Sequence, residues 1–173
     1  KPETAVSDND GKIFINNEDA SEIEVVDINT MKLIHSWPIA PGEAPSGLSI
    51  DRTTKRLFAG CDNKLLMIID ATNGKIIDSL PIGDGCDGTA FDPSIKTVYS
   101  SNGDGTLTVI KEMSKDKYKV VANLPTKRGA RTLTVDVKTH NVYSPTADFG
   151  EPAAGERRPP MLPGTFQVLV LKY

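Results

Sequence analysis

Apolar runs alternate with short polar turns along the chain, and the stretch Asn63–Gly88 shows the pattern in full. It contains an apolar run, a turn at Thr72–Gly74, a second apolar run and a loop rich in Gly and Asp. Enrichment in Val, Ile and Leu over runs of about six residues favours β-strands over helices. Asn and Gly accept the positive φ of a tight turn, so the two runs are predicted to pair as a hairpin.

This pattern repeats four times, and each repeat carries an Asp, a polar turn and then an apolar–aromatic pair. The aromatic residues are Phe14, Phe58, Tyr99 and Tyr143. They lie 44, 41 and 44 residues apart. A period of about 40–45 residues with short strands is typical of the blades of a β-propeller. The sequence therefore predicts an all-β fold with four blades, over approximately residues 4–45, 46–87, 88–130 and 131–173.

Each repeat is predicted to supply four antiparallel strands, except the last, which supplies three. In the second repeat the predicted strands are Gly47–Ile50, Arg56–Ala59, Leu65–Asp70 and Lys75–Leu80. The incomplete fourth blade is expected to leave an unpaired edge and uncovered blade faces, which invite pairing. We therefore expect either the C-terminal part of a longer ring or a chain that assembles with its own copy, as a homodimer through the open blade edges.

The polar loops are expected to gather on one face. Propeller strands alternate in direction, so the loops between second and third strands share a face with the connections between blades. We take ten residues of these loops as candidates for binding a small polar ligand or a protein. They are Asn16, Asn17, Asp62, Asn63, Asp84, Asp87, Asn102, Asp104, Arg128 and Arg131. Asn and Asp are also ordinary turn formers, so a purely structural role stays open.

Two features of these loops bear on ligand chemistry. The guanidinium groups of Arg128 and Arg131 suit a carboxylate or phosphate, or internal ion pairs with neighbouring Asp residues. Gly83–Gly88 matches G-x-G-x-x-G, but a strand rather than a helix follows it, so it does not indicate nucleotide binding. Calcium at the Asp-rich loops is considered, but no 12-residue pattern ending in Glu is present. We predict no cofactor and no metal site.

Cys61 and Cys86 are predicted to lie on this same face. They could form a disulfide if their Cα atoms lie within about 7 Å, or they could be two separate buried thiols. His35 is predicted in an outermost strand and His140 in a turn on the opposite face. No catalytic residues are assigned, because no nucleophile–base or paired C-x-x-C motif is present.

The segment Pro145–Gly164 is the one long irregular insert, and it is rich in Pro. Long loops in compact domains are often lids or binding loops. We expect either a flap over the central face or a flexible surface loop.

Charge and hydropathy argue against nucleic acid as a partner and against a membrane-spanning helix. The formal net charge is −3, so no basic field favours nucleic acid, which we regard as an unlikely partner. No apolar run approaches the roughly 20 residues that a membrane-spanning helix needs.

The phrases LLMIIDATNGKIIDSLPIGDG and TAFDPSIKTVYSSNGDGTLTVI, with the terminal PGTFQVLVL, resemble the YVTN/YncE-like bacterial β-propeller family. The resemblance implies a ring that is often seven-bladed, with about three further blades N-terminal to this chain, and export to the periplasm or beyond. The fold is shared with lactonases and amine dehydrogenase heavy chains. We therefore expect a secreted binding or scaffold protein. The alternative is a lactonase-like hydrolase or a dehydrogenase-associated propeller whose site spans the missing blades.

Overall fold

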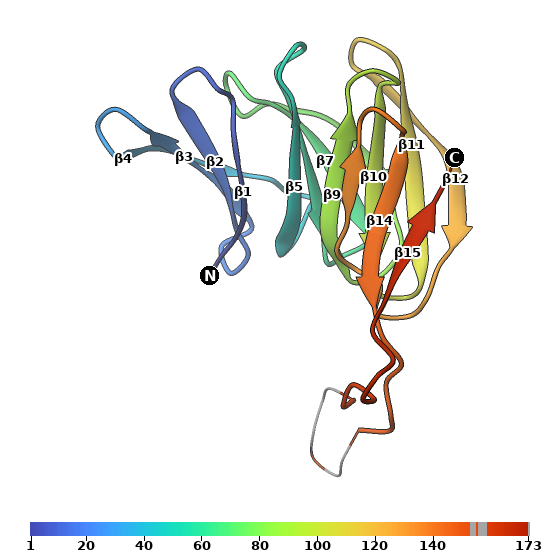
Figure 1. Cartoon of the computed structure of the whole chain (residues 1–173). Helices are drawn as coiled ribbons and strands as arrows, with labels where there is room; N and C mark the ends of the chain where they lie inside the picture. The colour runs from blue at the N-terminus through green and yellow to red at the C-terminus, as the bar shows by residue number, and fades with distance from the viewer. Residues whose placement is uncertain (153–154, 156–158, 173) are drawn as a thin grey trace.

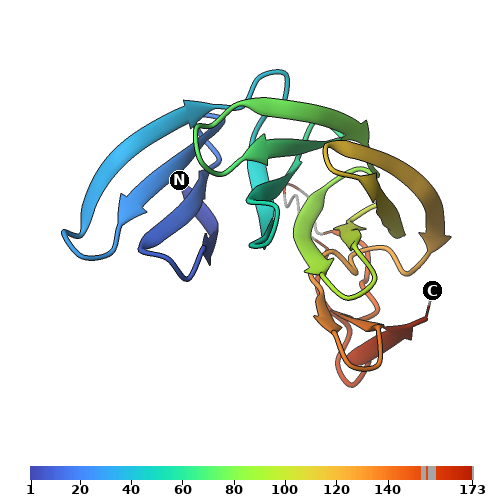
Figure 2. The ribbon, with the colours of Figure 1, turned by 90° about the horizontal axis from the view of Figure 1, so that it is seen from above.

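The computed structural model describes residues 1–152, 155 and 159–172. Over these residues the chain forms fifteen β-strands in four antiparallel sheets and no helix. The fold prediction is therefore confirmed, and the sheets are arranged as propeller blades. In Figure 2 they follow one another along an arc, from the N-terminal blade at one end to the C-terminal blade at the other.

The strands follow chain order within each sheet. Blade 1 contains β1 (Pro2–Ser7), β2 (Lys12–Asn17), β3 (Glu22–Asp27) and β4 (Lys32–Pro38). Blade 2 contains β5 (Pro45–Asp51), β6 (Arg56–Cys61), β7 (Leu65–Asp70) and β8 (Ile76–Pro81). Blade 3 contains β9 (Cys86–Asp92), β10 (Thr97–Asn102), β11 (Thr106–Ser114) and β12 (Lys117–Pro125). Blade 4 contains β13 (Thr134–Asp136), β14 (Asn141–Thr146) and β15 (Gln167–Leu171).

The first strand of each blade lies innermost, since β1 contacts β5, β5 contacts β9, and β9 contacts β13. The core lies between the blades rather than within one sheet. One apolar cluster joins blade 1 to blade 2, a second joins blade 2 to blade 3, and a third joins blade 3 to blade 4. Strands in the middle of the arc are buried on both faces, which explains why β7 reads as a nearly continuous apolar run.

One end of the blades carries the same Asp-capped turn four times, between the first and second strands. The capping residues are Asp8, Asp51, Asp92 and Asp136. Each carboxylate accepts a hydrogen bond from the backbone N–H two residues later, at 2.8–3.0 Å. These Asx turns explain the Asp that marks every repeat in the sequence. We call this end of the blades the turn face.

The predicted hairpin at Thr72–Gly74 is also present. Gly74 has a φ of 76° and donates a hydrogen bond from its N–H to the carbonyl of Asp70 at 2.8 Å. A Cβ on this glycine would lie 2.4 Å from the Trp37 ring, so both the backbone and the neighbouring blade require Gly.

The insert between β14 and β15 projects beyond the blade ends, on the side opposite the turn face (Figure 1). Within the described part, no helix is long and apolar enough to cross a membrane.

Candidate functional site

The end of the blades opposite the turn face carries the predicted row of polar loops, and we call it the loop face. Loops within blades and connections between blades alternate along it and are joined by backbone hydrogen bonds. The N–H of Asp62 donates to the carbonyl of Glu43 at 3.0 Å, and that of Gly103 to Gly85 at 2.9 Å. The N–H of Gly129 donates to Gly103 at 3.0 Å. The two groups of loops therefore share one face, as strand alternation predicts.

Two of the ten candidate residues do not belong to this surface. Asn16 is fully buried in β2, and its amide donates to the carbonyl of Gly47 in the next blade at 3.1 Å. Asn102 is fully buried in β10, where its amide donates to the hydroxyls of Thr106 and Thr108, at 3.0 Å each. Both side chains lie inside the sheets, so neither is exposed to meet a ligand at this surface.

Asn17 and Asn63 hold the loops in shape. The Asn63 side chain accepts from the N–H of Glu43 at 3.1 Å and donates to the carbonyl of Pro41 at 2.8 Å. The Asn17 side-chain oxygen accepts from the N–H of Ala20 in the turn at 3.4 Å, and its amide donates to Glu24 in β3 at 3.1 Å. Both side chains thus make the structural contacts that the turn-forming interpretation predicts.

The acidic candidates are more exposed. Asp84 lies 3.4 Å from the Lys64 ammonium, and its N–H donates to the Asp104 carboxylate at 2.8 Å. Asp104 also accepts from the Thr106 hydroxyl at 2.7 Å. The exposed Asp62 carboxylate has no hydrogen bond or ion pair within the described residues.

The two arginines of the connection 126–133 behave differently. Arg131 pairs with Asp87, with 2.8 Å between Nε and the carboxylate. Burial raises the pKa of Asp87, while the Arg131 charge acts in the opposite direction. Arg131 therefore follows the internal-pairing interpretation. Arg128 is exposed and, over the residues described, its guanidinium has neither an ion pair nor a hydrogen bond.

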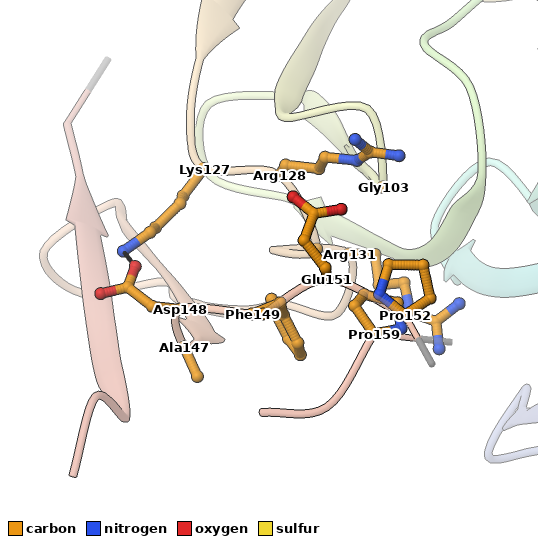
Figure 3. A pocket seen from close by; sticks show the side chains of 12 residues that line it. Gly103, Lys127, Arg128, Arg131, Ala147, Asp148, Phe149, Glu151, Pro152 and Pro159 are labelled. Carbon is orange, nitrogen blue, oxygen red and sulfur yellow. Dashed lines mark ion pairs between the residues drawn. The ribbon is translucent and has the colours of Figure 1, made fainter. Parts of the chain in front are cut away.

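Arg128 borders a hollow of about 610 Å³ that is open to solvent, which we call the Arg128 hollow. Its charged walls include Lys127, Arg131, Asp148 and Glu151, and its apolar walls include Ala147, Phe149, Pro152 and Pro159. Lys127 turns toward its ion-pair partner Asp148, while Arg128 extends to the other side, beside Gly103 (Figure 3). With Lys127 and Arg131 paired, Arg128 is the wall cation that keeps its donors free within the described part of the chain.

A second hollow of about 410 Å³ adjoins the first and shares Arg128 and Gly103 with it. Asp84 and Asp104 line its other side. The structure thus brings Asp84, Asp104 and Arg128 together, with Arg131 at the first hollow. The remaining candidates line neither hollow.

The described part of the insert forms one wall of the Arg128 hollow. A bridge pairs Phe149 with Met161, and the N–H of Leu162 donates to the carbonyl of Asp148 at 2.8 Å. Phe149 packs on Gly129, where an added Cβ would lie 2.9 Å from the ring. This packing favours the flap interpretation for the described residues. Part of the predicted insert, 153–154 and 156–158, lies outside them. Sequence reasoning missed Asp148 and Phe149, because no repeat offers an equivalent segment.

The cysteine pair does not form a disulfide: both residues are free and buried. Cys86 accepts a hydrogen bond from the Ser100 hydroxyl at 3.2 Å. Burial raises the pKa of Cys61 to about 12 and that of Cys86 to about 11, so both are protonated thiols near neutral pH. The alternative of two separate buried thiols is what the structure shows.

Neither histidine lies at the loop face. His35 is in the outer strand β4 and stacks on Trp37, with ring centroids 5.8 Å apart. His140 lies at the turn face and contacts the buried Asp92 carboxylate at 2.8 Å. Among the described residues, no group of three or more His, Cys, Asp or Glu side chains is placed to hold a metal ion.

No protein-family model matches the sequence, and no curated protein matches it. Solved structures do match. Kuenenia stuttgartiensis hydrazine synthase aligns with a TM-score of 0.74 and 17% identity, over 84% of this chain and 42% of that chain. A chain of the mitotic checkpoint complex aligns with a TM-score of 0.67 and 12% identity, over 78% of this chain and 42% of that one.

These likenesses show the fold alone, since both identities are low. This chain spans less than half of the length of either neighbour. Matches extend to 967 solved chains, so the fold is widely shared and selects no activity by itself. The YVTN/YncE resemblance remains a prediction from the sequence.

Proposed function

We propose that this protein is a binding module that takes a small oxyanion-bearing ligand, a carboxylate or a phosphate with an apolar body, in the Arg128 hollow. The observation that carries the proposal is the guanidinium of Arg128, which has no ion pair or hydrogen bond among the described residues and lies beside an apolar wall of Ala147, Phe149, Pro152 and Pro159. A guanidinium presents a planar fork of donors that matches carboxylate and phosphate oxygens. The apolar wall would cover the body of such a ligand.

The surrounding ion pairs support this role. Asp148 and Asp87 hold Lys127 and Arg131, so both cations are already neutralised and fixed in place. An incoming oxyanion would meet Arg128 without first breaking a salt bridge. The exposed carboxylates of Glu151, Asp84 and Asp104 would disfavour a multiply charged anion, so a carboxylate should bind more tightly than a phosphate monoester, which carries close to two negative charges near pH 7.

Binding is favoured over catalysis by where the reactive groups lie. Both thiols are buried and protonated, and both imidazoles lie away from the hollow. The hydrolase alternative requires a nucleophile or a base at the loop face, and no described His or Cys occupies it.

Export to the periplasm or the cell exterior is part of the proposal and rests on the sequence resemblance alone. Fractionation of cells that make the full-length protein tests it directly, because the protein should appear in the exported fraction.

The binding test uses two probes, 3-phenylpropanoate and phenyl phosphate, in ligand-observed NMR titrations. Loss of a charge-assisted hydrogen bond costs about 1.5–3 kcal/mol, so Arg128→Gln should weaken binding roughly 10- to 100-fold. Phe149→Ala should weaken it about tenfold through lost apolar contact.

The matched control is Lys75→Gln, which removes an exposed cation from the far hairpin of blade 2 and should leave affinity unchanged. The neutral amide 3-phenylpropanamide should bind no better to wild type than to Arg128→Gln. If neither probe binds wild type, or if both bind Arg128→Gln equally well, the proposal is wrong.

A further inference from the structure

The second hollow of the loop face, with a volume of about 410 Å³, carries charges of both signs on its walls. We call it the Asp104 hollow. It shares Arg128 and Gly103 with the Arg128 hollow, so Arg128 borders both. Asp84 and Asp104, both exposed, line the other side. The two adjoining hollows therefore present an apolar wall in the first, two carboxylates in the second, and a cation that belongs to both.

Hydrogen bonds hold the acidic side of the Asp104 hollow in place. One carboxylate oxygen of Asp104 accepts from the Thr106 hydroxyl at 2.7 Å, and the other accepts from the backbone N–H of Asp84 at 2.8 Å. The backbone N–H of Asp104 in turn donates to the carbonyl of Asp84 at 3.2 Å. Both donors to the carboxylate are neutral groups, so they fix its position and leave its negative charge unbalanced.

The opposite charges on the walls do not pair with one another. Within the part of the chain that the structure describes, Asp104 has no ion pair, and none joins Arg128 to either aspartate. Asp84 pairs with Lys64 at 3.4 Å, but both side chains are more than half exposed, so water screens this attraction. The hollow is therefore lined by a cation and an anion that are both available to a ligand.

We propose that the ligand of this site is an amino carboxylate with an apolar body, such as a free apolar amino acid. Its carboxylate binds Arg128, its ammonium group lies at Asp84 and Asp104, and its body packs on Phe149 and the prolines of the Arg128 hollow. The inference rests on the proposed function and narrows it. The acidic groups that disfavour a multiply charged anion at this site favour a cationic group for the same Coulombic reason.

The test compares three probes of one carbon skeleton in NMR titrations at pH 7 and low salt. They are 3-phenylpropanoate, L-phenylalanine and 3-amino-3-phenylpropanoate. The two amino acids differ from the first probe only by an ammonium group, placed on the first or the second carbon beyond the carboxylate. An ion pair at an exposed site strengthens binding by about 2- to 5-fold, so at least one amino acid should bind wild type more tightly than 3-phenylpropanoate by this factor.

Two variants remove the carboxylates one at a time. Asp104→Asn and Asp84→Asn should each weaken binding of that amino acid by about 2- to 5-fold, and neither should weaken binding of 3-phenylpropanoate. Thermal melts by circular dichroism verify that both variants fold. The matched control is Asp62→Asn, at an exposed aspartate in the corresponding loop of blade 2 that lines neither hollow. It removes the same charge and should leave the affinity for every probe unchanged.

The outcomes separate this inference from the proposed function. If 3-phenylpropanoate binds through Arg128 but neither amino acid binds more tightly, the inference is wrong and the proposed function stands. The inference is equally wrong if an amino acid keeps its full advantage over 3-phenylpropanoate in both Asp84→Asn and Asp104→Asn, or loses it in Asp62→Asn. If 3-phenylpropanoate does not bind wild type, the proposed function fails and the inference fails with it.

Discussion

The two ends of the blades differ in how they use the same residue type. At the turn face, each repeat places an Asp at the same position, and each carboxylate caps its turn. At the loop face, Asp62 and Asp104 lie in loops within blades and Asp84 lies in a connection between blades, and the connection 126–133 replaces acidic residues with basic ones. Residues that recur in every repeat therefore build the fold, whereas the Arg128 hollow forms where the sequence differs between the repeats.

The largest effect is expected from a capping Asp. The fully buried Asp92 accepts hydrogen bonds from the N–H and hydroxyl of Ser94, at 3.0 and 2.6 Å, and contacts His140 at 2.8 Å. Asp92→Ala should lower the free energy of unfolding by about 2–4 kcal/mol, because buried donors lose their acceptor. Asp62→Ala, at the exposed loop position, should change it by less than ~0.5 kcal/mol. Urea denaturation measures the free energy of unfolding of both variants. Equal losses in the two would contradict the structural role assigned to the turn face.

The two faces should also respond to acid with opposite sign. Burial acts to raise the pKa of Asp92, but hydrogen bonds from Ser94 and His140 prevail and hold it below its usual range. A lowered carboxyl pKa gives stability that is present above the unfolded pKa, about 3.9, and is lost as the pH falls through the folded value. The raised pKa of Asp87 works the other way, since protonation there favours the folded state.

We therefore expect the melting temperature to fall between pH 5 and pH 3, and to fall less in Asp92→Asn than in wild type. The melting temperature of Asp87→Asn should fall by at least as much as that of wild type over the same pH range. Thermal melts followed by circular dichroism at several pH values measure these differences. An Asp87→Asn variant that resists acid better than wild type would reverse the assignment.

A smaller effect is expected where the loop face holds the insert. Gly129 has a φ of 83° and lies against Phe149, whereas Gly155 has a φ of 87° and no atom of the described residues within 4 Å of the position its Cβ would take. Ala at either position carries the backbone strain of about 1 kcal/mol. Gly129→Ala should lower the free energy of unfolding by about 1 kcal/mol more than Gly155→Ala does, because it also displaces Phe149. Unfolding in urea compares the two variants, and equal costs would mean that the ring does not pack there.

The thiols give the smallest effect on stability and a clear chemical readout. Iodoacetamide at pH 7 should leave both Cys61 and Cys86 unmodified in the folded chain, because both thiols are buried and protonated. Unfolding in urea without reductant should expose two alkylation sites. A mass that shows no alkylation after unfolding would indicate a disulfide and contradict the structure.

The sequence predicted the fold well because the same pattern of Asp, polar turn and apolar–aromatic pair recurs in every repeat. In blade 2 the predicted strands agree with β5 to β8 within two residues at each end, since apolar runs mark the strands and Asx turns at Asp51 and Asp70 mark two of the bends. Residues of the loop face were harder to assign. Asn16 and Asn102 were grouped with the loop residues, yet both side chains are buried in the sheets, where their amide N–H groups donate to Gly47, Thr106 and Thr108.

The choice between Arg128 and Arg131 could not be made from the sequence. Both lie in one short connection, and only the placement of Asp87 in the fold shows which arginine is already paired. The role of Phe149 was equally hidden, because the insert has no equivalent in the other repeats. Residue type suggested which groups of this face could bind a ligand, and only the three-dimensional structure shows that, among the described residues, Arg131 is paired and Arg128 is not.

The most direct test of the proposed function is a map of amide chemical shifts in the wild-type chain during titration with 3-phenylpropanoate. We expect the largest shifts at Gly103, Arg128, Gly129 and Gly150, which surround the Arg128 hollow, and no shifts at the Asp-capped turns. In the same titration of Arg128→Gln these amides should shift only at ligand concentrations roughly 10- to 100-fold higher. Shifts confined to the turn face, or a loop face that responds equally in both proteins, would contradict the account.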